Sequence, residues 1–347
     1  MLKGVEGAIN KDGLFTYEWG RDKPLSDALC WTGYTLGAMC LLGETEIAKR
    51  LMKGLLWMEE LTGKPGYLPR CVYYGDKKFD YIQKVVITSE FADSKVGQEI
   101  VFLTDHDKFA AMKELGIWNN TSQDQYLGLF FGLHFASQSK STEINRNARK
   151  LEMIVTARLI KDNMRIKNED GKTCKFGKLN RFYQHVFFPD MKWNWRDKIM
   201  LKLMPLMKFQ DTLKRIVGSR LNRSNYFMIL CGLFLICQHK PEMKRYFKSV
   251  YKHVRNEENF VFNAMYNKLF NANMPVDELI EKISDKNQYV SKNCVVERDY
   301  IVPIEDRPVS HWYPKESPVL EQYGDDYTNR WTTRADCLLA LAIQGMR

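Results

Sequence analysis

Residues 122–133 read SQDQYLGLFFGL, and this stretch decides the fold that the sequence predicts. A polar, acid-bearing start runs directly into a series of small and aromatic residues that leaves no polar helix face. Residues 26–34, SDALCWTGY, repeat the pattern, and weaker copies begin near residues 222, 256 and 332. A helix that is apolar all round is buried on all sides. The five copies therefore predict inner helices whose polar starts converge on one shared mouth.

Four of the five copies are followed, after a short break, by an ordinary amphipathic helix. In the first of these, one stripe holds Ile47, Leu51, Leu55, Met58 and Leu61. The helix pairs predicted in this way are 27–42 with 45–61, 123–137 with 143–162, 224–238 with 241–254, and 259–270 with 275–283, and a last helix spans 333–344. This alternation predicts an all-α fold, an (α/α) toroid of helical hairpins. The toroid would be (α/α)6 or an incomplete version of it, with long irregular loops at the cavity mouth.

The connections between these helices are long. Residues 1–24 and 163–195 are expected to be irregular, residues 64–121 to contain one short helix at 107–115, and residues 284–331 to form a polar tail. A further helix at 196–217 contains Pro205, which predicts a kink. The chain has no Gly/Ser-rich or Pro-rich linker, so a single domain over residues 1–347 is predicted.

The charge of the chain favours anionic partners. Among 347 residues, 52 Lys and Arg outnumber 42 Asp and Glu, which gives a net charge of +10. Such a surplus suits an acidic polysaccharide, nucleic acid or a membrane surface, or it simply solvates the surface. The densest basic stretch, residues 140–181, begins with helical periodicity and is expected to coat an outer helix. Nucleic acid is disfavoured, because the sequence has no RNA-binding aromatic signature and no zinc-finger spacing.

Cysteine usage and hydropathy indicate a cytoplasmic protein without a membrane partner. The eight cysteines contain no CxxC pair, and four lie in apolar helical runs, which favours a reducing compartment. The first residues do not resemble a signal peptide, and the longest apolar run, 228–237, is too short to cross a bilayer. Glycine-rich nucleotide loops and paired histidine motifs are absent, so no metal and no cofactor is predicted. The oligomeric state cannot be inferred.

Two carboxylates at predicted inner-helix starts are the candidate catalytic residues. Asp27 and Asp124 each lie at or just inside such a start, and each is followed by an aromatic residue and a glycine, a composition typical of a ring-stacking pocket wall. Two carboxylates that face one cavity can act as acid and as base or nucleophile in glycoside chemistry. The alternative is that Ser and Asp here only cap the helices.

Aromatic and charged residues near these starts are the candidate substrate-binding residues. Trp31, Tyr126 and Arg70 follow from the first two copies, with Arg70 as a clamp for an anionic group. The loop that precedes the last helix adds aromatics for stacking, carboxylates and a histidine, namely His311, Trp312, Asp325, Asp326 and Trp331. Loops carry function more often than cores do, although these aromatics could also only hold the loop to the protein.

The runs DALCWTGYTLGA (27–38), GKPGYLPR (63–70) and SQDQYLGLFFGL (122–133) resemble those of six-hairpin glycosidase-like α/α-toroid proteins. The resemblance is clearest over the first 140 residues. It implies a carbohydrate-active enzyme, commonly a hydrolase of oligosaccharides and sometimes a polysaccharide lyase. Unsaturated glucuronyl hydrolases of this fold use two Asp at inner-helix starts, to which Asp27 and Asp124 are the nearest counterparts.

Three classes of function remain open from the sequence. The leading hypothesis is a glycoside hydrolase that acts on an oligo- or polysaccharide, including an acidic one. The second is a non-catalytic toroid that binds a glycan or a protein, which would keep the aromatic mouth without needing either Asp. The third is an isoprenoid- or peptide-processing toroid, which the missing zinc-ligand set and the missing DDxxD motif disfavour.

Overall fold

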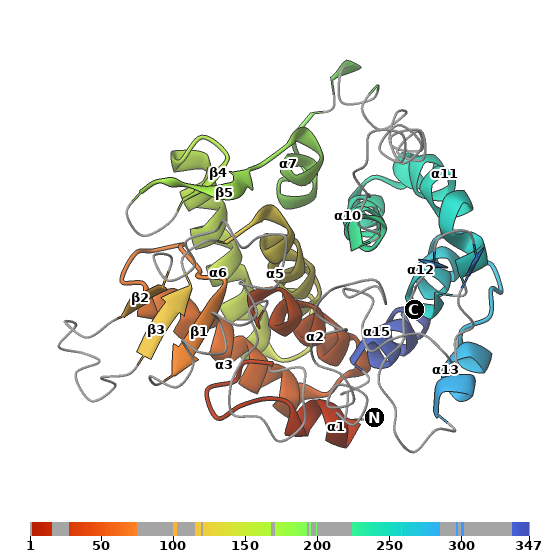
Figure 1. Ribbon diagram of the computed structural model, residues 1–347, viewed down its shortest axis with the longest axis horizontal. Helices are drawn as coiled ribbons and strands as arrows, with labels where there is room; N and C mark the ends of the chain where they lie inside the picture. Colours follow the sequence, from red (N-terminus) through yellow and green to blue (C-terminus); the bar gives the residue numbers. More distant parts are fainter. Residues whose placement is uncertain are drawn as a thin grey trace. The chain divides into compact units, whose positions relative to one another are not determined.

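The computed structural model describes residues 2–15, 28–74, 100–102, 115–118, 121–167, 171–192, 194–195, 199, 224–257, 259–284, 296–297, 300–301 and 335–346. Helices predominate among them and the strands are few and short (Figure 1). The described residues form two compact units, one up to Leu179 and the other from Asn180 onward. The single domain predicted from the sequence stays a prediction, because two contact units can belong to one domain.

The first unit contains two helical hairpins at the predicted positions. Its helices are α1 (Leu2–Gly7), α2 (Ala28–Leu42), α3 (Thr45–Leu61), α5 (Gln123–Ala136) and α6 (Thr142–Lys161). The turn between α2 and α3 passes through Gly43, whose φ of +78° is one that glycine adopts without strain. Helix α1 falls in a segment that the sequence predicted to be irregular.

Helices α2 and α5 pack against each other through glycines. A Cβ added to Gly33 would lie 2.2 Å from the carbonyl oxygen of Gly128, and one added to Gly128 would lie 2.3 Å from that of Cys30. Gly132 in turn approaches the backbone of Gly33. Because contacts advance along both helices in the same direction, α2 and α5 run parallel and begin at the same end. Gly33 and Gly128 therefore belong to a helix interface; the interpretation as a pocket wall is wrong for them.

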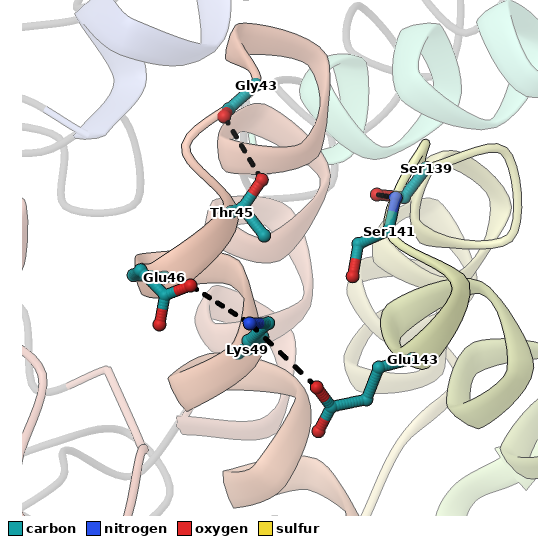
Figure 2. A network of polar contacts seen from close by, with 7 residues as sticks. All are labelled: Gly43, Thr45, Glu46, Lys49, Ser139, Ser141 and Glu143. Carbon is teal, nitrogen blue, oxygen red and sulfur yellow. Dashed lines mark hydrogen bonds and ion pairs between the residues drawn. The ribbon is translucent and has the colours of Figure 1, made fainter.

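The outer helices α3 and α6 contact each other near their starts (Figure 2). The ammonium of Lys49 lies 2.9 Å from Glu46 on its own helix and 3.9 Å from Glu143 on α6. At the same end, Asn145 of α6 donates to the carbonyl of Ser137, which follows α5. Helix α6 therefore starts where α5 ends and returns toward the start of α5.

Short antiparallel strands form in two segments for which the sequence predicted no strand. Strands β1 (Cys71–Tyr74), β3 (Leu115–Trp118) and β2 (Ile100–Phe102) form a three-stranded sheet in that order. The predicted helix at 107–115 is wrong at its last residue, because Leu115 pairs with Tyr74 in this sheet; residues 107–114 lie outside the described residues. Strands β4 (Arg165–Lys167) and β5 (Thr173–Lys178) form a hairpin in the segment predicted to be irregular.

The second unit contains two more predicted hairpins and the last helix. Its elements are α7 (Arg181–Phe187), α10 (Ser224–His239), the 3-10 turn η4 (Pro241–Met243), α11 (Lys244–Val254), the 3-10 turn η5 (Arg255–Glu257), α12 (Phe260–Phe270), α13 (Asp277–Ser284), the strands β6 (Val296–Glu297) and β7 (Tyr300–Ile301), and α15 (Ala335–Gln344). Pro241 opens the first turn after α10, where a missing N–H costs nothing.

The inner helices of the second unit contact each other at corresponding ends. The rings of Phe227 and Phe262, near the starts of α10 and α12, have centroids 6.3 Å apart. At the other end of α12, the ammonium of Lys268 donates to the carbonyl of Met346, which follows α15. Starts lie near starts and ends near ends, as in the α2–α5 pair of the first unit.

Several predicted features lie outside the described residues. They include residues 200–217 of the predicted kinked helix and all but a few residues of the predicted polar tail. In the part of the chain that the structure describes, no helix is both long enough and apolar enough to cross a membrane.

Candidate functional site

The starts of α2 and α5 are joined directly by hydrogen bonds. The backbone N–H of Cys30 donates to the side-chain oxygen of Gln125 (3.2 Å), and the Cys30 thiol lies 3.6 Å from the carbonyl oxygen of Asp124. Gln125 is only 1% exposed, so this hydrogen bond is shielded from water. Sequence reasoning missed Gln125, because a glutamine in a polar helix start carries no distinctive signal. The first turns of the two helices are thus fixed side by side.

Asp124 lies within the first turn of α5 and does not cap it. The N-cap residue is Ser122, which has an extended backbone but makes no side-chain capping bond. The Ser122 hydroxyl is buried without a hydrogen-bond partner among the described residues. The Asp124 side chain is partly exposed, and within the same residues its carboxylate makes no hydrogen bond or ion pair. A carboxylate in this place is available to contact a bound molecule.

Asp27, the second candidate carboxylate, lies outside the described residues. In the sequence it directly precedes Ala28, the first residue of α2. His311, Trp312, Asp325, Asp326 and Trp331 also lie outside the described residues.

Arg70 is attached to the same helix starts. Its carbonyl accepts a hydrogen bond from the backbone N–H of Leu29 (3.1 Å), in the first turn of α2. Two residues earlier, the carbonyl of Leu68 accepts one from the hydroxyl of Thr121, just before α5 (3.1 Å). The Arg70 side chain is partly exposed. The structure therefore brings together Arg70, Asp124 and the start of α2.

Trp31 and Tyr126 are close to this site but buried. Trp31 is 5% exposed and packs against Tyr34, with ring centroids 5.8 Å apart, and Tyr126 is 2% exposed. Burial also raises the pKa of the Tyr126 hydroxyl. A sugar could stack on either ring only if neighbouring residues moved. Their role as stacking surfaces stays a prediction.

A charged cluster closes α6 at the same end of the unit. Asp162 accepts from Arg158 (2.5 Å) and from Lys167 of β4 (2.9 Å), and its side chain is 8% exposed. Burial alone would raise the pKa of Asp162, but the hydrogen bonds from Lys167 and Arg158, with their charges, hold that pKa below its ordinary value. A Cβ on Gly66, in the segment before Arg70, would lie 2.7 Å from the Cβ of Arg158. This contact puts the end of α6 beside the 66–70 segment.

In the described ranges, no group of three or more His, Cys, Asp and Glu side chains could hold a metal ion. Comparison of the chain with protein-family models, with curated proteins and with solved structures gives no significant match. The case for any activity therefore rests on the residues of this chain.

Proposed function

We propose that this protein is a carbohydrate-active enzyme, a glycoside hydrolase that acts on an oligo- or polysaccharide at the joined starts of α2 and α5. The observation that carries the proposal is the hydrogen-bonded pairing of these starts, with Asp124 in one first turn and Asp27 directly before the other in the sequence. Two carboxylates near one point are what glycosidic bond cleavage needs.

Each carboxylate has a role in this proposal. One is protonated and donates a proton to the leaving oxygen, and the other activates water or attacks the sugar as a nucleophile. Asp124, in the first turn of α5, and Asp27, directly before α2 in the sequence, are the candidates for these two roles. Arg70, whose carbonyl is bonded to the first turn of α2, would supply a positive charge that suits an acidic sugar.

The architecture that we propose is the α/α toroid. Support comes from the parallel packing of α2 and α5 in the first unit, and from the contacts at corresponding ends of α10, α12 and α15 in the second. In a toroid, such helices begin at one mouth. The long segments before α5 and α15 would then border the cavity, and His311, Trp312, Asp325, Asp326 and Trp331 would be available to bind substrate.

The test is an activity assay on a panel of acidic and neutral glycans. Wild-type protein is compared with Asp124→Asn and with the matched control Asp190→Asn, which removes the same charge from an exposed position in the other unit. Release of reducing ends is measured together with the ultraviolet absorbance of an unsaturated uronate. We expect reducing ends to be released by wild type and by the control, and a loss of at least about 100-fold in Asp124→Asn.

Three outcomes contradict the proposal in different ways. A rise in absorbance with new reducing ends indicates a lyase and points to a tyrosine or histidine as the base. Equal activity in Asp124→Asn and wild type would show that Asp124 takes no part in the reaction. Binding of a glycan without any cleavage, unchanged in both variants, indicates a non-catalytic binding protein.

A further inference from the structure

Two cations face each other across the β4–β5 hairpin. Arg165 and Lys178 are direct partners in the antiparallel ladder. Side chains at directly opposite positions project from the same face, with Cβ atoms roughly 5 Å apart, and like charges there destabilise the pair. Both side chains are exposed, and neither makes an ion pair with any other described residue. The hairpin thus keeps a repulsive pair that nothing in the described structure neutralises.

The rest of the hairpin holds this pair in position. Ile166, next to Arg165, is 1% exposed, and Cys174 is 6% exposed, so one face of the hairpin is anchored in the core. Lys167 is bound to Asp162, and the N–H of Leu179 donates to the carbonyl of Met164 (3.1 Å). The carboxylate of Asp162 already accepts from two cations and does not serve the exposed pair. The backbone at Arg165 and Lys178 is therefore held in place by the rest of the hairpin.

The hairpin lies at the end of the unit that carries the candidate site. Strand β5 contacts α5, and the end of α6 lies beside the segment that leads to Arg70. Lys161, the last residue of α6, is exposed and adds a third positive charge close in the sequence to Arg165. The hairpin and the segment that leads to Arg70 thus both lie beside the pairing of α5 and α6.

We propose that Arg165 and Lys178, assisted by Lys161, form a subsite for the carboxylate of a uronic acid residue in an acidic polysaccharide, a few sugars away from Asp124. An arginine fork binds a carboxylate in two parallel hydrogen bonds, and the lysine adds a point charge on the other side. Binding of one anion would turn the repulsion across the strands into two attractive contacts. The polysaccharide part of this proposal rests on the proposed function; the anion site itself does not.

The experiment measures equilibrium binding of a hexameric oligogalacturonate by isothermal titration calorimetry, in the Asp124→Asn background so that the ligand is not consumed. The test variant carries Arg165→Gln and Lys178→Gln. The matched control carries Arg146→Gln and Lys150→Gln, which removes the same charge from two exposed positions in the first half of α6, away from the end that leads to the hairpin. Circular dichroism confirms that both variants are folded.

We expect the dissociation constant to rise about tenfold or more in the test variant, because charge-assisted hydrogen bonds are lost. In the control it should rise less than about twofold, because distant surface charges are screened by salt. A neutral hexasaccharide should bind equally to all three proteins. Equal loss in test and control variants would show that only the net charge matters and would overturn the subsite.

Two further outcomes separate this proposal from the proposed function. If wild type cleaves acidic glycans and the test variant binds the uronate as well as its parent does, the subsite is wrong and the hydrolase stands. If no glycan is cleaved and the test variant still loses uronate binding, the subsite stands and the hydrolase is wrong. A single-stranded oligonucleotide with six phosphates that binds more tightly than the uronate, and through the same pair, would overturn the assignment to a polysaccharide.

Discussion

Replacing Gly33 by alanine tests the contact between α2 and α5, on which the candidate site depends. The new Cβ would lie 2.2 Å from the Gly128 carbonyl oxygen, and the three atoms nearest to it all belong to the backbone. Backbone cannot change rotamer, so the two helices must separate by about 1 Å to restore an ordinary contact. Overpacking of this kind costs about 3 kcal/mol. Alanine regains about 1 kcal/mol of helix propensity, so the net loss is about 2 kcal/mol.

Gly37, one turn further along α2, provides the matched control. A Cβ there would meet the ring of Phe131 at 3.1 Å, a side chain that can shift by a few tenths of an ångström. Gly37→Ala should therefore be neutral or stabilise the protein by up to about 1 kcal/mol.

Urea unfolding measured by tryptophan fluorescence distinguishes the two substitutions. With a denaturant slope of about 2 kcal/mol per molar, Gly33→Ala should lower the midpoint by about 1 M and Gly37→Ala should not lower it. Equal midpoints for Gly33→Ala and wild type would refute the backbone contact. Because Cys30 and Gln125 join the helix starts, Gly33→Ala should also reduce any activity assigned to Asp124.

Four further substitutions test other contacts. Asn259→Ala removes an oxygen that caps α12 by accepting from two backbone N–H groups, and should lower the free energy of unfolding in urea by about 1–2 kcal/mol. Ser122→Ala removes a hydroxyl that has no hydrogen-bond partner among the described residues, and should change that free energy by less than about 0.5 kcal/mol. Tyr251→Phe should lower the free energy of unfolding by about 1–2 kcal/mol, because the Tyr251 hydroxyl donates a hydrogen bond to the buried side chain of Asn263 at 2.7 Å. Asp162→Asn should lower the free energy of unfolding by about 2 kcal/mol at pH 7. This loss is smaller than that expected for a fully buried ion pair, because the side chains of Arg158 and Lys167 are partly exposed to solvent.

The Asp162 substitution also has a definite pH dependence. The pKa of Asp162 is lowered in the folded protein, so its contribution is complete above the ordinary carboxyl pKa and is lost as the pH falls through the lower folded value. The stability difference between wild type and Asp162→Asn should therefore shrink on acidification below about pH 4. A difference that stays constant down to pH 2 would contradict the ion pairs.

For the two helix starts, equal losses of stability from Asn259→Ala and Ser122→Ala would contradict the hydrogen bonds described here.

Helix positions could be predicted from the sequence because local signals mark their ends. Helix α3 begins and ends at the predicted residues, since Gly43 and Gly63 with positive φ bound it and its apolar stripe is regular. Strands β1 to β3 could not be predicted, because each has only three or four residues and its partner comes from a distant segment. The predominance of helix was therefore confirmed, while the short sheets were missed.

The candidate site was predicted in part for a similar reason. Polar starts of inner helices are visible in the sequence, and those of α2 and α5 do come together. A helix that is apolar on every side carries no sign of which side meets a neighbour and which meets a cavity. That ambiguity explains why Gly33 and Gly128 were interpreted as a pocket wall and why the burial of Trp31 was not predicted.

The glycine contact between α2 and α5 also affects the order of events during synthesis. About 80 residues separate the end of α2 from the start of α5. At 5–20 residues per second, the ribosome takes roughly 4–16 s to make that stretch. During this time α3 can cover one side of α2, while the glycine-lined side has no partner and is open to chaperones or to other nascent chains. Lengthening this connection would add little to the free energy of the folded protein, since loop-closure entropy grows only slowly with length. It would prolong the interval in which the α2 surface can aggregate.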